Sequence, residues 1–150
     1  MTTIKCLAID DEPLALQQIS SYIDRTPFLE KTNICQSAFE ALEILAEKNV
    51  DLIFIDINMP DLNGIDFARS LEQKPFIIFT TAYSEYAIEG FKLDAADYLL
   101  KPIGYDDFLR AVNKVYKRFQ ILNEHADKYT INNEYLFVKS EYKLIRIEIR

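Results

Sequence analysis

Residues 51–60 decide the fold, and they read Asp51-Leu52-Ile53-Phe54-Ile55-Asp56-Ile57-Asn58-Met59-Pro60. The apolar, β-branched run from Leu52 to Ile55 predicts a buried parallel strand that ends in a carboxylate, Asp56. A loop of turn-forming residues follows as far as Gly64. Ligands of open α/β sheets bind just outside the carboxyl ends of the strands, so Asp56 lies where chemistry is expected. Taken alone, an Asp at this point is as often a loop-closing residue.

Strand-like and helix-like patterns alternate along the first 123 residues. We expect strands near residues 4–9, 31–36, 51–56, 76–79 and 97–100, and helices near residues 13–25, 37–48, 64–71, 84–93 and 105–123. Five strand–helix pairs predict an α/β domain with a parallel sheet, right-handed crossovers and helices on both faces.

After Asn123 the pattern changes. We expect a polar linker at residues 124–133, including His125–Lys128, and a short β-hairpin within residues 134–150. The hairpin strands would be Tyr135–Val138 and Leu144–Ile149. Because an isolated two-stranded hairpin is marginal in water, these strands need a partner.

Composition narrows the class of protein. The net charge of −7 argues against general affinity for nucleic acid, and most of the acidity lies before residue 125. Cys6 and Cys35 lie in apolar strand-like runs, so we expect buried free thiols in a reducing cytoplasm. No apolar run approaches the length of a membrane helix and no signal peptide is visible, so we expect a cytoplasmic protein without membrane contact.

The predicted strands end in a set of residues that suits one site. Asp10 and Asp11 follow the first strand, and Asp56, Thr81 and Lys101 end later ones. Clustered carboxylates repel one another, and Mg²⁺, which prefers carboxylates, waters and phosphate oxygens, relieves that repulsion. With Lys101 also neutralising charge, an Asp could act as nucleophile toward a phosphoryl group. The strand ends therefore predict a magnesium-dependent phosphoryl site.

Four motifs carry a resemblance to a known family. They are Asp10-Asp11-Glu12-Pro13, Asp56-Ile57-Asn58-Met59-Pro60 with Gly64 following, Thr81-Ala82, and Tyr98-Leu99-Leu100-Lys101-Pro102. Together they resemble the receiver domain of two-component response regulators, over about residues 1–122. The resemblance implies a flavodoxin-like, doubly wound sheet of five parallel strands in the order 2-1-3-4-5, with five helices.

The resemblance also implies a role for each acid. Asp56 would be the phosphoacceptor, phosphorylated by a sensor histidine kinase. Asp11, the Asp56 side chain and the main-chain carbonyl of Asn58 would bind Mg²⁺. Asp10 would act on the metal through a water.

The remaining site residues would bind the phosphoryl group and respond to it. Lys101 would bind it, and the Lys101–Pro102 peptide bond would be cis. Thr81 and Tyr98 would form a switch pair whose rearrangement controls homodimerisation. Such a domain is a phosphoacceptor switch and not an enzyme with a separate substrate.

The tail, residues 135–147, resembles the opening strands of a LytTR DNA-binding domain. We therefore expect residues 1–123 to form the receiver and residues 134–150 the truncated start of that output domain. DNA contacts would belong to the full-length protein only.

Three other functions are alternatives to a phosphorylated receiver. A hydrolase with an aspartyl-phosphate intermediate resembles enzymes that carry a second Asp two residues after the nucleophile, where this chain has Asn58. A flavodoxin-like cofactor binder needs a Gly-rich phosphate loop, and the chain has only three glycines. A phosphorylation-independent interaction module, or pseudo-receiver, is the third alternative, although the complete acidic site argues against it.

Overall fold

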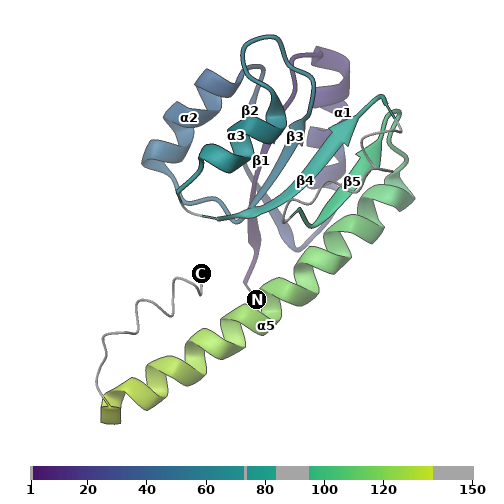
Figure 1. Ribbon diagram of the computed structural model, residues 1–150. Helices are drawn as coiled ribbons and strands as arrows, with labels where there is room; N and C mark the ends of the chain where they lie inside the picture. Colours follow the sequence, from purple (N-terminus) through teal and green to yellow (C-terminus); the bar gives the residue numbers. More distant parts are fainter. Residues whose placement is uncertain (1, 73, 84–94, 137–150) are drawn as a thin grey trace. The chain divides into compact units, whose positions relative to one another are not determined.

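Five parallel strands form the sheet of the computed structural model, which describes residues 2–72, 74–83 and 95–136 (Figure 1). The strands are β1 (Ile4–Ile9), β2 (Leu29–Cys35), β3 (Leu52–Asp56), β4 (Phe76–Thr81) and β5 (Asp97–Leu100). Their order is β2-β1-β3-β4-β5, and every neighbouring pair is parallel. The expected α/β class and strand order are confirmed.

Four helices lie within the described residues: α1 (Pro13–Asp24), α2 (Ala38–Glu47), α3 (Gly64–Ser70) and α5 (Tyr105–Leu136). Local sequence explains where three of them start. Pro13 occupies the first turn of α1, where no backbone donor is needed. The side chains of Ser37 and Asn63 cap α2 and α3 by accepting hydrogen bonds from backbone N–H groups. The helix predicted near residues 84–93 lies outside the described residues, as does most of the predicted hairpin.

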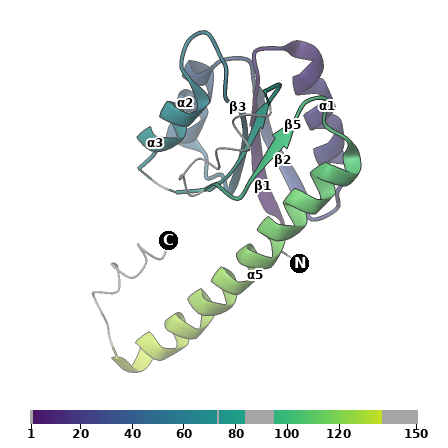
Figure 2. The ribbon, with the colours of Figure 1, turned by 45° about the vertical axis from the view of Figure 1, so that its right-hand side comes forward.

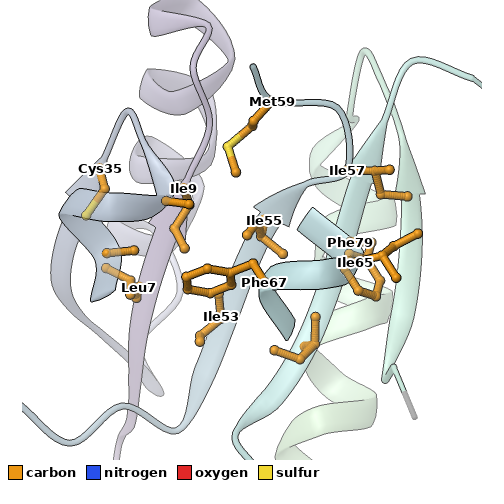
Figure 3. Packing of buried hydrophobic residues seen from close by; sticks show 13 residues of the cluster. Leu7, Ile9, Cys35, Ile53, Ile55, Ile57, Met59, Ile65, Phe67 and Phe79 are labelled. Carbon is orange, nitrogen blue, oxygen red and sulfur yellow. The ribbon is translucent and has the colours of Figure 1, made fainter. Parts of the chain in front are cut away.

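One hydrophobic layer fills the space between the sheet and helices α2 and α3, which lie on the same side of it (Figure 2). Its strand members alternate along β1, β3 and β4, as side chains on one face of a sheet must. Phe67 of α3 is fully buried among them. Figure 3 shows the labelled members Leu7, Ile9, Cys35, Ile53, Ile55, Ile57, Met59, Ile65, Phe67 and Phe79.

An aromatic group covers the opposite face of the sheet. The ring of Phe108 in α5 stacks on Phe54 of β3, with ring centroids 5.2 Å apart, and also contacts Tyr22 of α1. The Tyr22 hydroxyl donates a 2.8 Å hydrogen bond to the carbonyl oxygen of Ile103. This bond fixes the loop between β5 and α5, which begins with the cis Lys101–Pro102 bond implied by the resemblance.

Helix α5 corrects one prediction about the C-terminal part, the strand that was expected to begin at Tyr135. The helix continues to Leu136, so His125–Lys128 of the expected linker and the expected strand start at Tyr135–Leu136 are helical. The reason is that no Gly or Pro follows Gly104, so nothing in the local sequence breaks the helix. The chain divides into two compact units between Val115 and Tyr116. The expected domain boundaries at residues 123 and 133 stay predictions.

The two cysteines are buried and carry free thiols, as predicted. Burial, together with the charge of Glu40, raises the pKa of Cys35 to about 12, so this thiol stays protonated at neutral pH. No helix among the described residues is long and apolar enough to cross a membrane.

Candidate functional site

The carboxyl ends of the strands bring the predicted site residues to one edge of the sheet. Asp56 is the last residue of β3 and pairs with Thr80 of β4. Thr81 ends β4, and its carbonyl oxygen accepts a 2.7 Å hydrogen bond from the backbone N–H of Lys101. Asp10 directly follows β1, which neighbours β3. Parallel pairing thus assembles four strand ends that lie far apart in the sequence.

Three carboxylates form the acidic part of the site. Oxygen atoms of Asp10, Asp11 and Asp56 all lie within 4.8 Å of one another. Asp10 and Asp56 are only 3% and 5% exposed, whereas Asp11 is half-buried. Burial and the charge of Asp10 raise the pKa of Asp56 to about 6, although Lys101 opposes that rise. A tight set of oxygen ligands with uncompensated negative charge fits a hard divalent cation such as Mg²⁺.

Lys101 faces the carboxylates. Its Nζ atom lies 2.9 Å from Asp10 Oδ2, 2.9 Å from Glu12 Oε1 and 3.5 Å from Asp56 Oδ2. Burial alone would lower the pKa of Lys101, but hydrogen bonds to Glu12 and Asp10 and the nearby charges outweigh it and raise the pKa. The ammonium group is therefore charged across the physiological pH range.

The two buried acids differ in how closely protein donors approach them. Asp10 Oδ1 accepts a 2.9 Å hydrogen bond from the Glu12 backbone N–H, and its Oδ2 contacts Lys101. Asp56 Oδ1 accepts a long 3.4 Å bond from the backbone N–H of Asn58, whose side chain is exposed. Asp56 is thus the less strongly held carboxylate.

Thr81 and Tyr98 lie on neighbouring strands. Thr81 is fully buried, and its hydroxyl oxygen accepts a 3.0 Å hydrogen bond from the Tyr83 backbone N–H. The partly buried ring of Tyr98 stacks on Phe79, with centroids 5.5 Å apart. Burial raises the pKa of the Tyr98 hydroxyl. Tyr98 packs against the hydrophobic layer shared with α2 and α3.

Gly64 holds the loop that follows Asp56. Its backbone N–H donates a 2.8 Å bond to the carbonyl oxygen of Ile57. A Cβ atom at this position would overlap with the carbonyl oxygen of Asp56 and lie 3.1 Å from the Ile57 Cα. Only glycine allows this close approach, which explains the glycine of the sequence motif.

Two acidic residues in the loops at this edge of the sheet make contacts that the sequence did not predict. Glu12 occupies the N-cap position of α1, but its side chain makes no capping bond and instead contacts Lys101. Asp61 lies in the loop before Gly64, and its Oδ2 accepts a 2.9 Å hydrogen bond from the Ala38 backbone N–H at the start of α2. Both contacts join segments distant in sequence, so no local pattern could reveal them.

Comparison with known proteins matches the family model of the response regulator receiver domain to residues 6–113. The chain belongs to the response regulator receiver family. This receiver is 37% identical over 131 residues to the sensory transduction protein LytR of Staphylococcus saprophyticus, covering 85% of this chain and 52% of that protein. It is 40% identical over 115 residues to the transcriptional regulatory protein LytR of Staphylococcus aureus, covering 75% of this chain and 47% of that protein.

The receiver also resembles solved structures. It matches the response regulatory domain of mrkE from Klebsiella pneumoniae with a TM-score of 0.70 and 34% identity, over 78% of this chain and 98% of that one. The receiver domain of AraT from Geobacillus stearothermophilus gives a TM-score of 0.69 and 31% identity, over 79% and 97%. The chain spans about half the length of the LytR relatives it matches.

Proposed function

We propose that a sensor histidine kinase phosphorylates this receiver on Asp56, with Mg²⁺ in the acidic site. The resulting change at Thr81 and Tyr98 controls dimerisation and DNA binding by an output domain. The observation that carries this proposal is the position of the Asp56 carboxylate, within 4.8 Å of the Asp10 and Asp11 oxygens and 3.5 Å from the Lys101 ammonium.

In the proposed phosphoryl transfer, the Asp56 carboxylate is the nucleophile. One carboxylate oxygen attacks the phosphorus atom and forms the new P–O bond, while the bond to the donor's leaving group breaks and its electron pair leaves with that group. The attacking carboxylate must be ionised, and a pKa of about 6 leaves it mostly ionised at neutral pH. Lys101 can then bind oxygens of the bound phosphoryl group through charge-assisted hydrogen bonds.

The metal would be held by Asp11, the Asp56 side chain and the main-chain carbonyl of Asn58, with Asp10 acting through a water. The bonds of Asp10 support this division, because both of its oxygens already accept from Glu12 and Lys101. When bound, Mg²⁺ would neutralise the negative charge of the carboxylates and of the phosphoryl oxygens.

The switch would begin at the Thr81 hydroxyl. In the described state this oxygen accepts from the Tyr83 N–H. A hydrogen bond from this hydroxyl to a phosphoryl oxygen would draw Thr81 toward Asp56. The movement would leave space beside Thr81 that Tyr98 could fill. A local hydrogen bond would thereby become a packing change with a distant readout.

The output step rests on resemblance. The LytR relatives that match this receiver are about twice its length, and one of them is a transcriptional regulatory protein. We infer that the full-length protein binds DNA through a LytTR-type domain, acts in the cytoplasm and forms a homodimer on phosphorylation. The receiver itself is a phosphoacceptor switch that promotes only its own phosphorylation and dephosphorylation.

Labelling with acetyl phosphate tests the proposal. With Mg²⁺, intact mass spectrometry should show one added phosphoryl group, and Asp56→Asn should abolish it. Asp66→Asn, a change at an exposed carboxylate of α3, is the matched control and should be labelled like the wild type. Undiminished labelling of Asp56→Asn would refute the assignment, and an unlabelled wild type would favour the phosphorylation-independent module.

A further inference from the structure

The Lys101 ammonium is held closer to the acids that follow β1 than to the proposed phosphoacceptor. Its distances to Asp10 and Glu12 are both 2.9 Å, whereas the distance to Asp56 is 3.5 Å. An ammonium group has three N–H donors, and two short contacts use two of them. The contact with Asp56, the carboxylate that would receive the phosphoryl group, is the weakest of the three.

Glu12 has no other visible use for its side chain among the described residues. It occupies the N-cap position of α1 without making a side-chain capping bond. It also stands outside the cluster of Asp10, Asp11 and Asp56 that could hold a cation. Its backbone N–H donates a 2.9 Å hydrogen bond to Asp10 Oδ1, and its side chain accepts a 2.9 Å hydrogen bond from Lys101 Nζ.

We propose that Glu12 is a positioning residue that holds the Lys101 ammonium away from Asp56 until a phosphoryl group arrives. The proposal rests on phosphorylation of Asp56. A phosphoryl compound approaching Asp56 brings oxygens that need hydrogen bonds from the N–H groups of Lys101. Glu12 competes with those oxygens for the same N–H groups. Releasing Lys101 from Glu12 should therefore favour binding of the phosphoryl group and its transfer.

The expected effect is modest. The Glu12 side chain is 63% exposed, so solvent screens its contact with Lys101, and exposed ion pairs contribute little. Loss of this contact should increase the affinity for beryllium fluoride and the phosphorylation rate by about two- to fivefold. The acetyl phosphate concentration that gives half the maximal rate should fall by a larger factor than the maximal rate rises, because Glu12 competes with the binding of acetyl phosphate.

Two variants separate the contact from its charge. Glu12→Gln removes the charge, whereas Glu12→Asp keeps it on a side chain one methylene shorter, which withdraws it from Lys101. Both should bind beryllium fluoride more tightly than the wild type in saturating Mg²⁺. Glu43→Gln, a change at an exposed carboxylate of α2, is the charge control and should match the wild type.

The outcomes are distinct. Equal behaviour of Glu12→Asp and wild type would overturn the proposal, because charge alone would then explain any effect of Glu12→Gln. Unchanged or weaker binding in both variants would also overturn it. The ¹⁵Nζ resonance of Lys101 should move in both variants before any phosphoryl analogue is added, and an unmoved resonance counts against the contact. An unlabelled wild type would instead show that the proposed phosphorylation fails.

Discussion

Lys101 and Asp10 form the shortest contact between oppositely charged groups that are both largely buried in the site, with 2.9 Å between Nζ and Oδ2. The Lys101 side chain is 14% exposed and that of Asp10 is 5% exposed. Removing one member of such a pair leaves the other buried without compensation, which costs more than the pair itself contributes. This asymmetry predicts a clear stability defect at position 101.

Lys101→Met should lower the free energy of unfolding at pH 7 by about 3 kcal/mol, because Asp10 and Asp56 lose their shared ammonium. The loss should shrink as the pH falls below about 6, where the Asp56 carboxylate becomes protonated, and added Mg²⁺ should partly restore stability. Urea unfolding measures it. Lys114→Met is the control, since the Lys114–Asp97 pair is 3.0 Å long but Lys114 is 47% exposed. An equal loss in both variants would contradict the argument.

Asp56→Asn should stabilise the metal-free protein at pH 7. The folded-state pKa of Asp56 is about 6 against an ordinary value of 3.8, so the folded state binds this proton more tightly than the unfolded state. Stability from this group is therefore fully present below pH 3.8 and is lost as pH rises through 6. The variant avoids that loss and should gain up to roughly 3 kcal/mol at pH 7.

The gain of Asp56→Asn should vanish near pH 4 and shrink in Mg²⁺, which compensates the wild-type carboxylate. Unfolding curves of the two proteins from pH 4 to pH 8 test the sign. Asp66→Asn, a change at an exposed carboxylate of α3, is the charge control. A variant less stable than the wild type at pH 7 would show that the Asp56 carboxylate is not destabilised by burial.

Gly64→Ala should distort the loop after Asp56. The new Cβ would overlap with the Asp56 carbonyl oxygen, so the backbone that carries the acceptor must shift. We expect a loss of about 1–3 kcal/mol in unfolding free energy and weaker Mg²⁺ binding. In Gly104→Ala the Cβ meets only the Asp106 Oδ1 atom, at 2.8 Å, which can rotate away. Unchanged Mg²⁺ affinity in Gly64→Ala would contradict the prediction.

Thr81→Ala should separate phosphoryl binding from its readout. The variant keeps Asp56 and Lys101, so it should still bind beryllium fluoride, with a loss of about one hydrogen bond or roughly 1 kcal/mol. The ring resonances of Tyr98 should shift much less than in the wild type. Thr26→Ala, a change in a buried Thr after α1, provides a control for loss of a buried hydroxyl. A full wild-type response of Tyr98 in Thr81→Ala would refute the coupling.

Residues after Asn123 should promote self-association. The sequence after Asn123 carries the apolar residues Leu136, Val138, Leu144, Ile145 and Ile147. A version ending at Asn123 should have a lower, or more phosphorylation-dependent, dimer fraction by light scattering. The 150-residue chain, which is acidic overall, should form no specific complex with promoter DNA in gel shifts at physiological salt. An unchanged dimer fraction or a specific complex would contradict these expectations.

Much of this receiver is determined by its sequence. Apolar runs ending in Asp10, Asp56, Thr81 and Lys101 predicted the parallel sheet and the meeting of these residues at one edge of it, because period and strand-end position are local properties. The same approach failed at Tyr135 and Leu136, which were expected to begin a strand but continue helix α5. Helix α5 continues there because the segment lacks Gly and Pro and its residues tolerate a helix.

The tertiary structure alone decided how the charges are shared. Nothing local to Glu12 distinguishes a helix cap from a partner of Lys101, which lies 89 positions away and reaches it only when β5 joins the sheet. The raised pKa of Asp56 likewise follows from burial and from the charge of Asp10, which follows another strand. Sequence determines which side chains stand at the strand ends, and the paired sheet determines the distances, on which electrostatic energies depend.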